Sequence, residues 1–230
     1  MDDVSARQIA RLLGAAVVTT CAMLNAACSG GGRANAEACP DIEVVFARAR
    51  GEPPGVGWTG QAFVDALRSQ VGGRSLGVYA VNYDAQDPAP GTSPEGAAVT
   101  SAGAKDASAR VEYMAANCPG TRMVLGGYSR GAIIIDLITA DGVPPQGYIP
   151  APMPPEVADH VAAVAVLGNA WGKWVGAPLT ANSPLYGAKA IDLCTPGDPN
   201  CSDGTDRSAH FRYLESGMVN QAATFAASRL

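Results

Sequence analysis

Residues 123–131 read MVLGGYSRG, and this stretch decides the fold. A short apolar run, 123–125, leads into the Gly-x-Ser-x-Gly pattern of residues 127–131, and a helical pattern continues to Thr139. This order predicts a strand, a sharp turn with Ser129 at its apex, and a helix. The serine in such a turn has a strained backbone, and small residues two positions away on each side avoid clashes.

A second pentapeptide, GRSLG at residues 73–77, fits the same pattern, so the surrounding sequence must decide between the two. Ser75 follows an expected helix and precedes an expected strand, which is the reverse of the order that exposes a nucleophile. We therefore interpret Ser75 as part of an ordinary turn. Ser129 is the candidate nucleophile.

The rest of the chain alternates apolar strand patterns with helical patterns. Strands are expected at 42–47, 77–83, 161–167 and 190–193, and helices at 58–71, 96–117 and 218–230. Five strands separated by helices predict an α/β fold, in which a parallel sheet is covered by helices on both faces. Ligands bind beyond the carboxyl ends of such strands, which is where Ser129 falls. The Pro-rich stretch 141–159 is an expected loop, too short for a cap domain.

Composition restricts the class of protein. Of the 230 residues, 47% are apolar and 16% are charged, which predicts one folded domain with a sizeable core. The net charge of −5 and the absence of a Lys/Arg cluster argue against nucleic-acid binding. Two isolated histidines provide no metal-ligand set, and no nucleotide-binding glycine motif occurs, so neither a metal nor another cofactor is expected.

The N-terminal region has the pattern of an export signal. Two arginines precede an interrupted apolar run, 12–27, and small residues at 34–36 offer a cleavage site. We expect residues 1–36 to be a cleaved signal peptide and residues 37–230 to be a single secreted domain, extracellular or associated with the cell wall. The alternatives are an uncleaved membrane anchor and a lipid anchor at Cys28.

Cleavage would leave an even number of cysteines in an exported chain, namely Cys39, Cys118, Cys194 and Cys201. Two disulfides are then expected, and three pairings are open. Cys194 and Cys201 are close in sequence and would close a tight loop. This spacing favours the set Cys39–Cys118 and Cys194–Cys201.

A serine hydroxyl requires a general base to act as a nucleophile at neutral pH. Where a serine follows a strand in this way, the acid and then the histidine come later in the chain. His210 lies between the last expected strand and the last expected helix, which is the right place for the base. His160 opens the strand 161–167 at the end away from the site, so we interpret it as structural.

The acid that orients the base should follow the fifth strand. Asp198 lies in a turn bracketed by two cysteines, and a disulfide there would hold its carboxylate in place. Asp192 lies inside the strand, whereas Asp203 and Asp206 have the pattern of solvated loop charges. The expected catalytic residues are therefore Ser129, Asp198 and His210.

These residues together resemble the cutinases, and most closely the secreted cutinase-like proteins of mycobacteria. The resemblance rests on Gly-Tyr-Ser-x-Gly after an apolar strand, on Cys194-x3-Asp198-x2-Cys201, and on His210 twelve residues beyond the aspartate. It begins at Cys39-Pro40-Asp41 and runs to Ser216-Gly217-Met218. It implies a lidless α/β-hydrolase that cleaves carboxylic esters, with the disulfides paired as above.

The resemblance also implies an oxyanion hole built from the backbone N–H groups of Arg50 and Arg130. Family members have Ala-Arg-Gly and a small hydroxyl residue after the first strand, where this chain reads Ala-Arg-Ala-Arg at 47–50. The side-chain hydroxyl is therefore missing, and Ala49 is expected to resist a backbone angle that glycine accepts. The two arginines would repel each other or favour a negatively charged substrate.

Two further features concern the substrate. The polar stretch 203–208, just before His210, weakens an assignment to cutin itself. The apolar residues between the fourth and fifth strands either line an acyl-binding wall or pack in the core. They are Trp171, Trp174, Val175 and Leu185.

The sequence thus predicts a secreted, monomeric serine carboxylesterase. It would hydrolyse short- to medium-chain acyl esters through an acyl-enzyme, taking an ester or lipid substrate, with peripheral contact to the cell envelope or a lipid surface. One alternative is a phospholipase A or thioesterase with the same triad. A second is a catalytically silent cell-surface protein that retains the fold.

Overall fold

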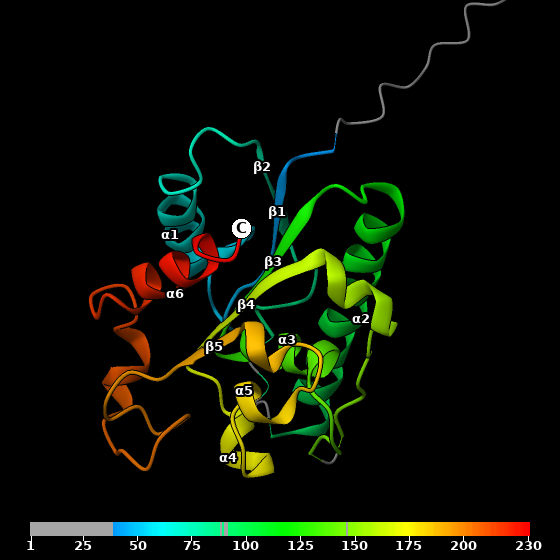
Figure 1. Ribbon diagram of the computed structural model, residues 1–230. Helices are drawn as coiled ribbons and strands as arrows, with labels where there is room; N and C mark the ends of the chain where they lie inside the picture. The colour runs from blue at the N-terminus through cyan, green and yellow to red at the C-terminus, as the bar shows by residue number, and fades with distance from the viewer. Residues whose placement is uncertain (1–38, 88, 90–91, 146) are drawn as a thin grey trace, which may run out of the picture. The chain divides into compact units, whose positions relative to one another are not determined.

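The computed structural model describes residues 39–87, 89, 92–145 and 147–230 (Figure 1). The predicted signal peptide and Cys28 lie outside the described residues. The strands are β1 (Ile42–Ala47), β2 (Leu76–Ala80), β3 (Arg122–Tyr128), β4 (Val161–Leu167) and β5 (Ala190–Leu193). The helices are α1 (Gly57–Arg68), α2 (Pro94–Asn117), α3 (Arg130–Thr139), α4 (Trp171–Val175), α5 (Leu179–Asn182) and α6 (Met218–Ala227).

The five strands form one parallel sheet in the order β2-β1-β3-β4-β5, which confirms the predicted architecture. The connection from β1 leads outward to β2, whereas β3, β4 and β5 are added on the other side of β1. The chain therefore changes direction between β1 and β3. A crevice for ligands is expected beyond the carboxyl ends of these two strands, at Ala47 and Tyr128.

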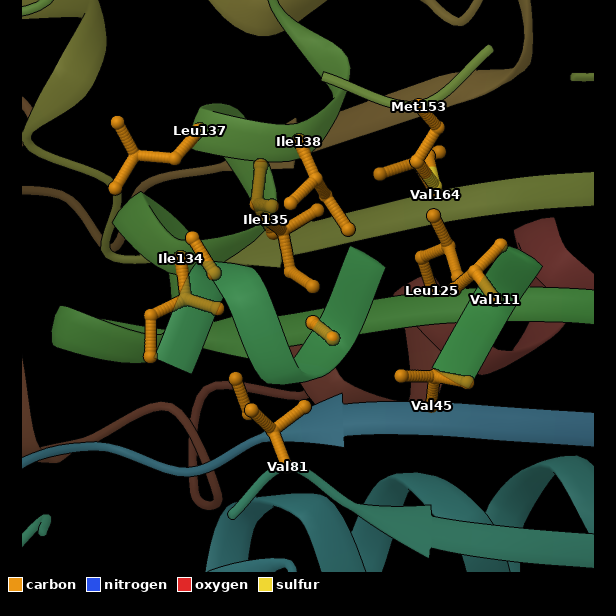
Figure 2. Packing of buried hydrophobic residues seen from close by; sticks show 14 of the residues in the cluster. Val45, Val81, Val111, Leu125, Ile134, Ile135, Leu137, Ile138, Met153 and Val164 are labelled. Carbon is orange, nitrogen blue, oxygen red and sulfur yellow. The ribbon is translucent and has the colours of Figure 1, made fainter. Parts of the chain in front are cut away.

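Helices cover both faces of the sheet, with α1 and α6 on one face and α2 and α3 on the other (Figure 1). Side chains of a strand point alternately to its two faces, and β1 divides accordingly. Val45 packs toward α2 and α3, whereas Val44 and Phe46 pack toward α1 and α6. Figure 2 shows Leu125 and Val164 from the neighbouring strands in the same layer as Val45.

The sequence patterns located the long elements and missed the short ones. α1 ends at Arg68 rather than at residue 71, and β2 ends at Ala80 rather than at residue 83. The short helices α4 and α5, and 3-10 helices at Pro155–His160, Gly187–Lys189 and Arg207–Phe211 (η3), were not expected. Elements of three to six residues are too short to show a hydrophobic period, so only packing defines them. Within the described ranges, no helix is both long and apolar enough to cross a membrane.

Two disulfides are present, and they are the pairs that the cysteine spacing favours. Cys39–Cys118 ties the segment before β1 to the end of α2, with a Cα–Cα distance of 5.5 Å. Cys194–Cys201 closes the turn after β5, with a Cα–Cα distance of 5.8 Å. The second disulfide encloses the loop that contains Asp198.

Candidate active site

Ser129 lies at the turn between β3 and α3, where the sequence predicts a nucleophile. Its backbone φ is 55° and its ψ is −115°, and it is the one non-glycine residue with a left-handed φ in the described part of the chain. Its N–H donates to the carbonyl of Leu167 in β4 at 2.9 Å, and its carbonyl accepts from Ala132 at 2.9 Å. The sheet and the helix therefore hold the serine in a conformation that costs about 1–3 kcal/mol.

The two glycines of the pentapeptide are required by close backbone contacts. A Cβ on Gly127 would lie 2.3 Å from the carbonyl oxygen of Gly131. A Cβ on Gly131 would lie 1.9 Å from the carbonyl oxygen of Ala47. Because both neighbours are backbone atoms, they cannot move aside, and the start of α3 approaches β1 closely only without side chains there.

Three side chains form a continuous hydrogen-bonded chain beyond the carboxyl ends of the strands. His210 Nε2 lies 2.8 Å from Ser129 Oγ, and His210 Nδ1 lies 2.7 Å from Asp198 Oδ2. Ser129 comes from the β3–α3 turn, Asp198 from the loop after β5, and His210 from η3. The structure thus brings together the three residues that the sequence analysis proposed.

The carboxylate of Asp198 is completely buried and receives donors on both oxygens. Tyr213 donates its hydroxyl to Oδ2 at 2.8 Å, and the N–H of Asn200 donates to Oδ1 at 2.9 Å. The N–H of Thr195 in turn donates to the Tyr213 hydroxyl at 3.1 Å. The sequence analysis missed Tyr213, because nothing in the spacing distinguishes it from any other apolar residue after His210.

A second tyrosine fixes the backbone of the histidine loop. Tyr128, which precedes the nucleophile, donates its hydroxyl to the carbonyl of His210. Its ring lies 5.4 Å from the imidazole and 5.2 Å from the ring of Tyr213, measured between centroids. Both tyrosines are buried, so His210 is held from β3 as well as from its own loop.

The loop after β1 is organised by the buried carboxylate of Glu52. Its Oε2 accepts from the N–H of Ala49 at 2.7 Å, and its Oε1 accepts from the N–H of Thr59 at 2.9 Å. The left-handed φ values in this loop belong to Gly51 and Gly55, at 81° and 89°, and the N–H of Gly51 donates to the carbonyl of Ala85 at 2.8 Å. Ala49 does not adopt a left-handed φ, so the structure does not require a glycine angle at this position.

The two arginines expected near the oxyanion hole have different surroundings. The Arg130 side chain is buried, and it donates to the carbonyls of Asp87, at 3.4 Å, and Ala89. Burial lowers the pKa of the Arg130 guanidinium, and the charge of Arg50 lowers it further. Arg50 is exposed and lines the cleft at Ser129, whereas Arg130 is not among the residues that line this cleft. Of these two arginines, Arg50 therefore lines the cleft, and its charge acts on Arg130 in the repulsive sense that the sequence analysis considered.

A cleft of about 860 Å³ opens at Ser129 and His210, between the loop after β1 and the loop that carries the histidine. Large apolar side chains at its edge are exposed, with Trp58 at 64%, Phe211 at 76% and Leu214 at 45%. These residues were missed because each is a single apolar residue in a polar segment. The cleft is therefore more apolar than the stretch 203–208 suggested.

None of the four residues proposed for an acyl-binding wall lines this cleft. Trp171 is buried in the core, as the packing alternative required. Trp174 and Val175 line a separate cavity of about 530 Å³, where the Trp174 ring lies 5.7 Å from the ring of Tyr148. Leu185 is exposed and lines neither cavity.

The residues that were set aside in favour of the triad have other partners. Ser75 donates its hydroxyl to the carboxylate of Asp41 at 2.7 Å, in the turn that precedes β2. Asp192 lies inside β5 and accepts from the Asn169 side chain at 3.2 Å. His160 is the last residue of a 3-10 helix, at the start of β4 and at the opposite end of the sheet.

The residues Cys194, Asp198 and Cys201 have ligand atoms within 4.8 Å of one another. The two sulfur atoms are joined in a disulfide, so neither is available as a thiolate ligand. This group therefore offers a single carboxylate, which His210 and Tyr213 already occupy. Its chemistry does not fit a metal site.

The fold places the chain among the α/β-hydrolases, and a hydrogen-bonded serine, histidine and aspartate is the arrangement that serine hydrolases of this class use. The cutinase family model matches residues 38–230, and the chain belongs to the cutinase family.

The chain is similar to named proteins over most of its length. Carboxylesterase Culp1 of Mycobacterium tuberculosis is 48% identical over 229 residues, covering 97% of this chain and 97% of that protein. Phospholipase Culp4 of the same species is 46% identical over 227 residues, covering 98% of this chain and 93% of that protein.

Two solved structures are similar in fold. The catalytic core domain of acetyl xylan esterase from Trichoderma reesei has a TM-score of 0.68 at 26% identity, covering 84% of this chain and 100% of that one. Trichoderma reesei cutinase in complex with a phosphonate inhibitor has a TM-score of 0.60 at 25% identity, covering 83% of this chain and 76% of that one.

Proposed function

We propose that the chain is a serine carboxylesterase whose catalytic triad is Ser129, His210 and Asp198. The observation that carries this proposal is the unbroken chain of hydrogen bonds of 2.8 Å and 2.7 Å that joins the three side chains. The strained serine at a strand-to-helix turn supports it independently, because this backbone places the hydroxyl at the edge of the cleft.

The reaction proceeds in two halves through an acyl-enzyme. Ser129 Oγ attacks the ester carbonyl carbon while His210 Nε2 removes the hydroxyl proton, and the imidazolium then gives that proton to the departing alcohol oxygen. Water attacks the acyl-enzyme in the same way, and His210 returns the proton to Ser129. Asp198 keeps Nδ1 of the imidazole protonated and stabilises the imidazolium between these transfers.

The backbone N–H groups of Arg50 and Arg130 are the proposed oxyanion hole. Arg130 is the first residue of α3, so its N–H has no acceptor within the helix and lies at the positive end of the helix dipole. Arg50 faces the same cleft from a loop that Glu52 braces through two backbone N–H groups. Such preformed donors stabilise the negative charge of the tetrahedral intermediate.

The proposed substrates are short- to medium-chain acyl esters. The apolar side chains at the cleft edge support this choice, because they offer a contact surface for an acyl chain. The two disulfides and the export pattern of residues 1–36 support a secreted protein. We further propose that the secreted domain acts as a monomer, in peripheral contact with the cell envelope or a lipid surface.

A phospholipase is the second candidate function. The relative named phospholipase Culp4 is nearly as similar to this chain as the relative named carboxylesterase Culp1. The same triad would act on either ester. Hydrolysis of phosphatidylcholine vesicles, compared with hydrolysis of short-chain p-nitrophenyl esters, distinguishes the two functions.

The substitution Ser129→Ala tests the proposal. We expect it to lower kcat for the hydrolysis of p-nitrophenyl butyrate by about 10⁴-fold or more, while the unfolding temperature stays unchanged. The matched control is Ser75→Ala, which alters the second Gly-x-Ser-x-Gly pentapeptide and should leave the rate unchanged. A fluorophosphonate probe should label the wild-type protein and the control but not Ser129→Ala. An unlabelled wild-type protein would instead support a catalytically silent relative.

A further inference from the structure

Arg207 lies in the catalytic cleft although no catalytic step uses it. It is the first residue of η3, the 3-10 helix that carries His210, and its exposed side chain lines the same cleft as Ser129. The sequence predicts only that the segment 203–208 is polar, and the structure shows that its one cation, Arg207, lines the cleft at Ser129.

Two of the acids in the loops around Arg207 have other partners. Asp206 caps η3 by accepting from the N–H of Ser208 at 3.0 Å, and it forms an ion pair with Arg212 at 2.6 Å. Asp198 is bound by the histidine and a tyrosine. No carboxylate in the described part of the chain lies within 4.0 Å of the Arg207 guanidinium. Its charge therefore faces the cleft without a neutralising partner.

The other charged groups of the cleft increase this asymmetry. Arg50 adds a second exposed cation, whereas the one acid of the lining, Glu52, is buried and accepts two backbone N–H groups. The whole chain carries a net charge of −5, so the mouth of the cleft is positive on a negatively charged protein. A local field of this kind attracts anions and repels cations.

We propose that the cleft selects carboxylic esters that carry a negatively charged group, and that Arg207 binds this group. The inference rests on the proposed esterase function and names its substrate class. A guanidinium matches the geometry of a carboxylate or a phosphate with two parallel hydrogen bonds. The apolar residues Trp58, Phe211 and Leu214 would hold the hydrocarbon part of the same molecule. Arg207 is thus a specificity-determining residue, separate from the groups that break the ester bond.

The test uses two p-nitrophenyl esters of the same acyl chain that differ in charge at the far end, and it measures the release of p-nitrophenol from each. One is the mono-p-nitrophenyl ester of adipic acid, whose free carboxylate is ionised at neutral pH, and the other has that carboxylate methylated. We expect the wild-type protein to have the higher kcat/KM on the anionic ester. The preference should shrink as the salt concentration rises from about 0.05 to about 0.5 M, because salt screens exposed charges.

The variant Arg207→Gln should lower kcat/KM on the anionic ester by about five- to tenfold. It should change kcat/KM on the neutral ester by less than about twofold. Arg68→Gln is the matched control, since it removes the same charge from the far end of α1. Arg68 lies about 15 Å along that helix from Trp58, which exceeds the screening length at physiological salt. We expect Arg68→Gln to keep the wild-type preference.

A second pair of substrates identifies the source of the anion. Vesicles of phosphatidylglycerol and of phosphatidylcholine with the same acyl chains present an anionic and a zwitterionic head group. Faster hydrolysis of the anionic member in both pairs supports an anionic lipid as the substrate. Faster hydrolysis of the anionic member in the adipate pair alone supports a soluble ester as the substrate. Equal rates within both pairs, or an equal loss on both adipate esters in Arg207→Gln, would overturn the inference. If the wild-type protein cleaves neither adipate ester nor any p-nitrophenyl ester, the proposed function fails instead.

Discussion

Asp198 and Asp136 are both completely buried, and their surroundings are opposite. Asp198, in the loop after β5, accepts hydrogen bonds from a histidine, a tyrosine and a backbone N–H. Asp136, in the middle of α3, has no hydrogen-bond partner on either carboxylate oxygen. Burial raises the pKa of Asp136 well above its usual range, and the neighbouring charge of Asp192 in β5 raises it further.

The difference shows what a protein must supply to bury a carboxylate. An ion without partners in the interior is disfavoured by several kcal/mol, so the group takes up a proton instead. The loop around Asp198 supplies fixed donors, and the carboxylate is available to orient the catalytic base. The core around Asp136 supplies no donor in hydrogen-bonding geometry, although the Asn169 side chain is close enough to offset part of the effect of burial, and the neutral form of the carboxyl is favoured there. The proposed role of Asp198 is therefore catalytic, whereas Asp136 is expected to affect stability.

The largest expected effect comes from removing the charge at Asp198. In Asp198→Asn the side chain keeps its shape, but its amide can donate to Nδ1 of His210 and so favour the wrong tautomer. We expect kcat to fall by about 10³–10⁴-fold, measured with p-nitrophenyl butyrate. Asp192→Asn, at the acid inside β5, is the control and should retain nearly full activity. Equal losses in the two variants would contradict the assignment of the acid.

A smaller effect is expected from one of the donors to Asp198. Tyr213→Phe keeps the buried ring and removes the hydroxyl, which leaves Oδ2 with the histidine alone. Because a hydrogen bond to a charged group contributes about 1.5–3 kcal/mol, kcat should fall by about tenfold or more. KM should stay within about twofold, since Tyr213 acts through Asp198 and is a positioning residue.

The control for Tyr213 is Tyr113→Phe, an exposed tyrosine of α2, which should leave both constants unchanged. A purely structural role would lower the unfolding temperature of Tyr213→Phe and leave kcat per folded molecule as in the wild type. That outcome would remove Tyr213 from the catalytic arrangement.

The smallest effect concerns stability at Asp136. Its raised pKa means that the folded chain binds the proton more tightly than the unfolded chain. The free energy of unfolding contributed by this group is therefore greatest below about pH 4 and falls as the pH rises toward the raised pKa. Asp136→Asn should flatten this dependence and be more stable than the wild type above that pKa by about 1 kcal/mol or more.

Urea unfolding between pH 4 and pH 8 measures this difference. Asp192→Asn removes a second carboxyl whose pKa is raised, chiefly by burial. It should therefore also make the free energy of unfolding depend less steeply on pH. The exposed Asp41, whose pKa is lowered by its hydrogen bonds with Ser75, acts in the opposite sense, but it is present in every protein compared. Parallel curves for the wild type and Asp136→Asn would show that Asp136 is ionised in the folded state.

The sequence predicted Ser129, Asp198 and His210 as a triad because their order and spacing follow from the chain path of an α/β sheet, and the structure brings the three side chains into one hydrogen-bonded chain. It could not identify Tyr213 or Tyr128, because a hydroxyl that donates across a loop leaves no trace in local spacing. The sequence did not predict Trp58 and Phe211 as cleft residues for a related reason, since a single exposed apolar residue carries no periodic signal. The sequence also could not show that Arg50 lines the cleft while the Arg130 side chain is buried, because sequence fixes the position of a residue along the chain and not the direction of a long side chain.

The sequence alone determined the order of strands and helices, the turn at Ser129 and the disulfide pairs that spacing favoured. These depend on apolar periods, on glycines placed in a short motif and on the close spacing of Cys194 and Cys201, all of which can be read along the chain. The tertiary structure alone decided which buried aspartate has donors, which arginine faces the cleft, and which side chains form its edge. Those outcomes depend on groups far apart in sequence that the fold brings within hydrogen-bonding distance, and on the solvent that it excludes.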